Sequence, residues 1–180
     1  MGADTISQAD RNRLLALARE TLTARVNRQP LPHPPQGGAL DLERGAFVSI
    51  HHHGALRGCL GRLQPSRLAE TVVHLAAAVS DSDSRFEPVT PEELPGIELE
   101  ISVLTPEEEI ASVNDIEVGR HGLIVEQGYR RGLLLPQVAV ERRWDRTTFL
   151  EHTCLKAGLP RDAWRHGARV LVFEAEVFGS

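Results

Sequence analysis

The sequence predicts an α+β protein with a mixed or antiparallel sheet, about three helices and a smaller β-rich lobe. Two stretches, near residues 45–61 and 122–135, place strand-forming residues on either side of a glycine-containing turn, which is typical of β-hairpins. Three other stretches carry apolar residues at helical spacing. Three helices and about six strands in mixed order, with hairpins and only one possible crossover per helix, favour the α+β class.

Local patterns predict the order of elements in the first half of the chain. Ser7 has the position of a helix N-cap, and the first helix is expected over residues 8–26. Residues 27–42 are rich in proline and glycine and form an irregular connection. After the first hairpin we expect a helix capped by Ser66, followed by the polar loop 80–88.

The second half returns to strands before its last helix. Residues 97–103 alternate apolar with polar side chains, which predicts a half-buried strand, and the second hairpin has strands over 122–126 and 132–135. A helix is expected from Asp145 to the glycine at position 158. In a closing strand over residues 169–178, the side chains expected to face inward are Leu171, Phe173, Ala175 and Val177.

Composition places the chain among ordinary globular proteins. Its 180 residues, 41% hydrophobic and 25% charged, suffice for a single domain (residues 1–180) with a larger and a smaller lobe. The formal charge of −5 argues against nucleic acid as a partner. A run of 18 apolar residues and a signal segment are both lacking, so we expect a cytoplasmic protein without membrane contact, and two cysteines this far apart fit reduced thiols.

One strand of the first hairpin combines a cysteine with an arginine and two glycines, an unusual composition for a strand. A loop of three or five residues centred on Gly54 is expected, and this register sets Ser49 opposite Cys59. It also sets His51 opposite Arg57, so that all four side chains share one face. A nearby cation favours the thiolate, the nucleophilic form of cysteine. The predicted catalytic residues are therefore Cys59, Arg57 and His51.

The residues expected to bind a substrate surround this thiol. Gly58 and Gly61 would bare backbone amides that suit a small anion, and the hydroxyl of Ser49 lies on the same face as the thiol. Asp83 and Arg85 would complete the pocket wall if their loop folds over the hairpin. The alternative is structural, because a free cysteine is often a packed core residue and the loop would then be a capped helix end.

Three consecutive histidines, at positions 51 to 53, are candidate metal ligands. Neighbouring residues of a strand point to opposite faces, and no second ligand pair at helical or C-x-x-C spacing accompanies them. No metal site is therefore predicted, and the sequence identifies no cofactor.

Six ordered motifs resemble the AMMECR family, whose prokaryotic members are labelled protein A of the AmmeMemoRadiSam system. The motifs lie at residues 56–61, 83–88, 100–104, 119–124, 131–139 and 156–160. The similarity runs from Leu14 to Phe178 and implies a compact α+β domain. It further implies that the segment with Arg57 and Cys59 lines a pocket between a larger and a smaller lobe, and that a Memo-like protein and a radical S-adenosylmethionine protein are partners.

The resemblance implies no particular reaction, so two functions stay open. One is an enzyme with a Cys/Arg pocket that acts on an anionic small molecule or nucleotide. The other is a non-catalytic binding or accessory module that works with the Memo-like and radical S-adenosylmethionine proteins.

Overall fold

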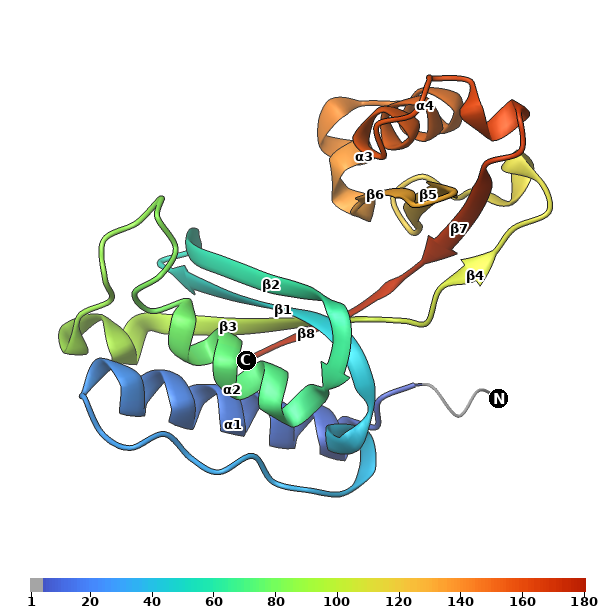
Figure 1. Cartoon of the computed structure of the whole chain (residues 1–180). Helices are drawn as coiled ribbons and strands as arrows, with labels where there is room; N and C mark the ends of the chain where they lie inside the picture. Colours follow the sequence, from blue (N-terminus) through green and yellow to red (C-terminus); the bar gives the residue numbers. More distant parts are fainter. Residues whose placement is uncertain (1–4) are drawn as a thin grey trace. The chain divides into compact units, whose positions relative to one another are not determined.

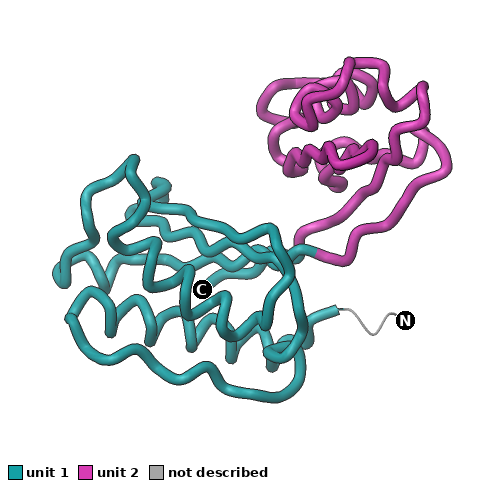
Figure 2. Tube along the Cα trace, in the orientation of Figure 1, with its two compact units in different colours: residues 1–104, 176–180 teal, residues 105–175 magenta. Residues whose placement is uncertain are grey.

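The computed structural model describes residues 5–180 and divides the chain into two compact units. Unit 1 comprises Met1–Leu104 with Glu176–Ser180, and unit 2 comprises Thr105–Ala175 (Figure 2). Each unit has its own antiparallel strand pairs, its own helices and its own buried apolar cluster. The predicted α+β class is confirmed.

Unit 1 consists of a four-stranded sheet with two long helices against one face (Figure 1). The strands lie in the order β2-β1-β3-β8, and β1 pairs antiparallel with both β2 and β3. Its elements are α1 (Gln8–Val26), η1 (Gly38–Asp41), β1 (Glu43–His52), β2 (Ala55–Arg67), α2 (Leu68–Ala78), η2 (Pro91–Gly96), β3 (Ile97–Leu104) and β8 (Ala175–Gly179).

The core of unit 1 lies between the helices and the sheet. Alternate residues of β1, namely Ala46, Val48 and Ile50, are fully buried in the same cluster as the apolar side chains of α1 and α2. The intervening residues, among them Phe47 and Ser49, consequently point to the opposite face of the sheet. This alternation decides which side chains can form a site on that face.

Unit 2 has a second four-stranded sheet, in the order β4-β7-β5-β6, in which each strand pairs antiparallel with its neighbours. Its elements are β4 (Glu108–Glu109), η3 (Val113–Asp115), β5 (Gly122–Gln127), β6 (Arg130–Leu134), α3 (Pro136–Arg142), α4 (Arg146–Lys156), η4 (Ala163–Arg165) and β7 (Arg169–Phe173). One face of α4, including Phe149 and Cys154, is buried against this sheet. No helix within residues 5–180 is long and apolar enough to cross a membrane.

The strongest local patterns predicted their elements correctly. The first helix runs over Gln8–Val26, and the hydroxyl of Ser7 accepts a hydrogen bond from the Asp10 amide as an N-cap. The last helix is capped in the same way by Asp145, which accepts from Thr148. In both places the cap residue directly precedes a run of apolar residues at helical spacing.

The predicted loop of the first hairpin is wrong, although part of its register holds. The turn has two residues, because His52 pairs with Ala55, and His53 and Gly54 both have positive φ angles of 53° and 76°. A register shift between Ile50 and His51 then leaves Arg57 without a cross-strand neighbour on β1. Ser49 therefore faces Cys59, as predicted. The predicted pairing of His51 with Arg57 is incorrect, since His51 faces Leu56.

Three further boundaries differ from the prediction. The second helix begins at Leu68, because β2 continues to Arg67 and the hydroxyl of Ser66 binds that of Thr71. The strand of the second hairpin ends before Pro136, and a short helix that was not predicted begins there, with proline in its first turn.

The closing strand is divided at Glu174 into β7 and β8, which belong to different sheets. Phe178 is buried and Val177 is 53% exposed, contrary to the prediction, because the change of sheet resets which residues face a core.

Replacement of Gly61 by alanine is expected to destabilise unit 1. The added Cβ would lie 2.1 Å from Cδ1 of Phe47, the cross-strand neighbour of Gly61. We expect the free energy of unfolding, measured by urea denaturation, to fall by roughly 1–3 kcal/mol. In a Phe47→Ala background the same replacement should have a much smaller effect, and an equal loss in both backgrounds would contradict the close contact.

Candidate functional site

The thiol of Cys59 lies on the edge strand β2 beside the hydroxyl of Ser49 on β1. The Cys59 amide donates to Asp83, a residue outside the sheet, and not to β1. Cys59 and Ser49 are therefore a cross-strand pair without mutual backbone hydrogen bonds. Side chains approach closely in such pairs, and Ser49 Oγ donates to Cys59 Sγ at 3.1 Å. Cys59 is half-buried, whereas the second cysteine, Cys154, is fully buried.

Asp83 and Arg85 satisfy the free backbone groups of the edge strand at Cys59. Asp83 Oδ2 accepts from the Cys59 amide at 2.9 Å, and Arg85 Nη2 donates to the Cys59 carbonyl at 3.3 Å. The two side chains also bind each other, with Arg85 Nε and Nη2 at 2.9 and 2.7 Å from the carboxylate. We call this pair the edge clamp, because it takes the place of a neighbouring strand.

The carboxylate of the edge clamp is buried and its guanidinium is largely exposed. The side chain of Asp83 is 5% exposed and that of Arg85 is 58% exposed. Hydrogen bonds from the Arg85 side chain, followed by the one from the Cys59 amide, hold the pKa of Asp83 well below its ordinary value. The same ion pair raises the pKa of Arg85. Asp83 is therefore an anion that fixes the backbone amide of Cys59.

Arg57 holds the next segment of the same loop and is not free to act as an isolated cation. Its Nε and Nη2 donate to the two oxygens of Glu93 at 2.8 and 3.1 Å. Its Nη1 and Nη2 also donate to the carbonyls of Glu87 and Pro88, at 2.9 and 3.4 Å. The hydrogen bonds from Arg57 to the Glu93 carboxylate lower the pKa of Glu93, and so does the hydrogen bond that this carboxylate accepts from the Thr90 amide.

Both glycines of the motif have packing reasons for their lack of a side chain. A Cβ on Gly58 would lie 3.0 Å from Cγ2 and 3.1 Å from the carbonyl of Val79, at the end of α2. A Cβ on Gly61 would overlap the ring of Phe47. The close approach of helix to strand thus explains Gly58 without a ligand.

The structure brings Ser49, Cys59, Asp83 and Arg85 into one contiguous group. Arg57 lies on the same strand but binds a different part of the loop, and His51 faces Leu56 on one side and Glu98 on the other. Within residues 5–180, no group of three His, Cys, Asp or Glu residues is arranged to hold a metal ion.

Two acidic residues near the site were not predicted from the sequence. Glu93 could have been suspected from the spacing of Thr90 and Glu93, which form a capping box at η2, but its bond to Arg57 has no local signal. Glu100 on β3 is the cross-strand neighbour of Ser49 opposite to Cys59. A thiol, a hydroxyl and a carboxylate therefore follow one another across three strands.

A family model described as AMMECR1 matches residues 15–178. The chain belongs to the AMMECR1 family. Its relatives include Protein Mbar_A1807 of Methanosarcina barkeri, 44% identical over 173 residues that cover 90% of this chain and 86% of the relative. Protein MJ0810 of Methanocaldococcus jannaschii is 40% identical over 186 residues, covering 92% of each chain.

A solved structure is similar along nearly the whole chain. It is the crystal structure of the uncharacterized protein PH0010 from Pyrococcus horikoshii, with a TM-score of 0.77 and 39% sequence identity. The match covers 97% of this chain and 93% of that one. The fold described above is therefore shared with this protein.

Replacement of Asp83 by asparagine is expected to weaken the edge clamp and to change the acid sensitivity of the fold. Because its pKa is lower in the folded than in the unfolded state, ionised Asp83 stabilises the fold above its ordinary pKa of 3.8. This contribution is lost as the pH falls below that value. At pH 7 we expect the variant to be less stable by about 2 kcal/mol in urea denaturation.

Between pH 5 and 3 the stability of the variant should fall less steeply than that of the unchanged protein. Glu92→Gln, at an exposed position of η2, is the control and should follow the unchanged protein. Parallel pH profiles for Asp83→Asn and the unchanged protein would show that the clamp does not stabilise the fold.

Replacement of Arg57 by lysine is expected to loosen the segment between Glu87 and Glu93. Lysine keeps the charge but cannot bind both carboxylate oxygens and two carbonyls at once. Hydrogen–deuterium exchange of the Thr90 amide should accelerate by roughly tenfold, which corresponds to the loss of about one charged hydrogen bond. Arg62→Lys, at an exposed position of β2, is the matched control, and identical exchange in both variants would contradict the bracing role of Arg57.

Proposed function

We propose that this AMMECR1 protein is an enzyme in which Cys59 is the nucleophile and the substrate is a small anionic molecule or nucleotide. The observation that supports it is the hydrogen bond from Ser49 Oγ to Cys59 Sγ at 3.1 Å, on a half-buried thiol. A donor at this distance holds the sulfur in one position and can stabilise negative charge on it during reaction. The edge clamp fixes the backbone of the same residue.

Arg85 is the residue we assign to the charge of the substrate. Its contacts with Asp83 and with the Cys59 carbonyl use Nε and Nη2, and its side chain is 58% exposed. Nη1 is therefore the donor assigned to the substrate anion. Gly58 and Gly61 stay in the proposed substrate site only as neighbours of the thiol, because packing against Val79 and Phe47 accounts for them.

The reaction is a nucleophilic attack that forms a carbon–sulfur bond. The electron pair of the Cys59 sulfur forms the new bond, and the leaving group departs with the pair of the bond that breaks. His51, two residues from Ser49 along β1, is the base assigned to remove the thiol proton through a water and to return it to the leaving group. Arg57 keeps the loop beside the site in place through Glu93.

A second candidate is a non-catalytic accessory module that holds a ligand for a Memo-like protein and a radical S-adenosylmethionine protein. The charges near the thiol favour the accessory module, because both arginines have a carboxylate partner: Arg57 is paired with Glu93 and Arg85 with Asp83. The cation expected beside the thiol is thus compensated. The net charge of −5 continues to argue against nucleic acid, and a cytoplasmic location fits either candidate.

Iodoacetamide labelling of the native protein distinguishes the two candidates. We expect Cys59 to be alkylated under native conditions and Cys154 only after unfolding, as measured by mass spectrometry of the two peptides. Ser49→Ala should slow the labelling of Cys59 by roughly threefold to tenfold at neutral pH, the effect of one hydrogen bond.

Ser102→Ala, on β3 opposite Phe47, is the matched control and should leave the labelling rate unchanged. Cys59→Ser assigns the signal to the thiol. A Cys59 that stays unlabelled until the protein unfolds would exclude the nucleophile and favour the accessory module.

A further inference from the structure

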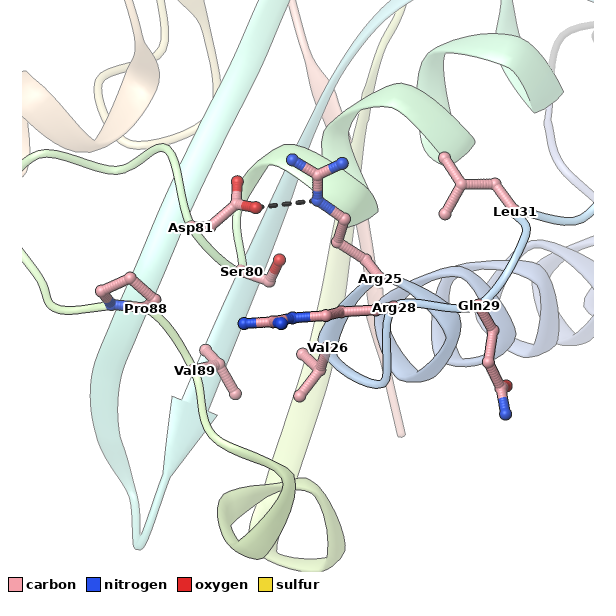
Figure 3. Close-up of a pocket in the computed structure, with 9 residues that line it drawn as sticks. All are labelled: Arg25, Val26, Arg28, Gln29, Leu31, Ser80, Asp81, Pro88 and Val89. Atoms are coloured by element: carbon pink, nitrogen blue, oxygen red, sulfur yellow. Dashed lines mark hydrogen bonds and ion pairs between the residues drawn. The ribbon is translucent and has the colours of Figure 1, made fainter.

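Unit 1 contains a cavity of about 550 Å³ that does not include Cys59 (Figure 3). It is bordered by the end of α1 with the residues that follow it, and by both ends of the loop 80–89. The volume falls within the range of pockets that hold small organic molecules.

Two arginines give the cavity a net positive charge. Arg25 Nε donates to Asp81 Oδ2 at 2.7 Å, which compensates one of the two charges. The guanidinium of Arg28 has no hydrogen bond or ion pair to any residue of the described range 5–180. Figure 3 shows its guanidinium extending past Val26 toward the loop residues Ser80 and Val89. The cavity therefore has one uncompensated cation and a second one whose terminal nitrogens are not used by Asp81.

The backbone at Arg28 indicates that this cation is not there for stability. The amides of Arg28 and Gln29 donate to the carbonyls of Arg25 and Ala24, which is the hydrogen-bond pattern of a Schellman motif. Arg28 itself has a φ of +55°, a conformation that glycine adopts without strain and arginine does not. The last turn of α1 already carries a basic residue, Arg25, to interact with the helix dipole. A strained residue with an unpaired charge points to a ligand.

Besides the charged residues, the cavity wall has two polar residues, Gln29 and Ser80, and an apolar part. Val89 is buried, Val26 is half-buried, and Leu31, 39% exposed, and Pro88 complete this wall. The arginines together with the apolar part of the wall therefore favour a ligand with both a negative group and an apolar body, because a simple inorganic anion would leave Leu31 and Pro88 in contact with water.

We propose that the cavity binds a small organic anion, whose phosphate or carboxylate group is held by Arg28 and Arg25 and whose apolar body packs against Leu31 and Pro88. Guanidinium groups bind both anions with two parallel hydrogen bonds, so the shared chemistry is an oxyanion on an aromatic or aliphatic body. This site is separate from the proposed chemistry at Cys59, because the thiol is not among its lining residues and the hydrogen bond to the thiol comes from Ser49.

The test is isothermal titration of the full chain with phenyl phosphate, benzoate and benzyl alcohol at low salt. We expect one-to-one binding of at least one anion with a Kd of about 1 mM or below, and no binding of the neutral alcohol. Tighter binding of phenyl phosphate identifies a phosphate ligand, and tighter binding of benzoate identifies a carboxylate. The absence of binding of both anions at roughly tenfold this concentration would overturn the proposal.

Variants at Arg28 separate binding from stability. Arg28→Gly should raise Kd by at least about tenfold and raise Tm by roughly 2–4 °C, because glycine relieves the strained backbone while removing the cation. Arg28→Gln should raise Kd to a similar extent without the gain in Tm. An unchanged Kd in either variant would overturn the proposal.

The chain offers a matched control at Arg143, the C-cap residue directly after α3, which has a φ of +54° but lies outside the cavity. Arg143→Gly should raise Tm and leave Kd unchanged. Cys59→Ser should also leave Kd unchanged, so failure of this proposal and failure of the proposed enzyme function can be told apart.

Discussion

An edge strand has backbone groups that need partners, and in unit 1 this constraint shapes the whole surroundings of Cys59. The amide and the carbonyl of Cys59 point away from the sheet, and Asp83 and Arg85 bind both of them. Through this contact the loop after α2 is attached to β2. Arg57 and Glu93 attach the same loop at a second point. These contacts hold the backbone of Cys59 in place, while its side chain remains half-buried beside Ser49.

The distribution of compensated and uncompensated charge separates the two proposed sites. Near the thiol, each arginine has a carboxylate partner, Arg57 with Glu93 and Arg85 with Asp83. In the cavity at the end of α1, Arg28 has none within the described residues. Burial of the Asp83 carboxylate makes its bond with Arg85 costly to break, because it would leave an unpaired charge in the interior. An anion that displaced Asp83 from Arg85 would have to meet this energetic cost. An anion bound by Arg28 in the cavity would not, because Arg28 has no carboxylate partner among residues 5–180 to lose.

Much of the fold follows from short-range patterns in the sequence. The cap of Ser7 and the helical spacing after it suffice to define α1, and Asp145 does the same for α4. The patterns fail where a choice depends on distant residues. The short helix after Pro136 has too few residues to show a period, and the strand divided at Glu174 keeps its local character while changing sheets. Which of Val177 and Phe178 is buried is decided by the sheet that receives β8, which no local pattern records.

By itself the sequence determined the α+β class and the two hairpins, because strand-forming residues flank a glycine-containing turn in each. The predicted meeting of Ser49 with Cys59 holds, but it depends on a two-residue turn and a register shift after Ile50 that the sequence did not predict. The sequence also marked Asp83 and Arg85 as neighbours of the thiol. Only the tertiary structure decided what the charged groups do. The bulge at Arg57 turns that side chain toward Glu93, a partner 36 residues away, and the pairing of Asp83 with the Cys59 amide spans 24 residues. Side-chain contacts at such separations arise from the path of the whole chain, so neither composition nor spacing predicts them.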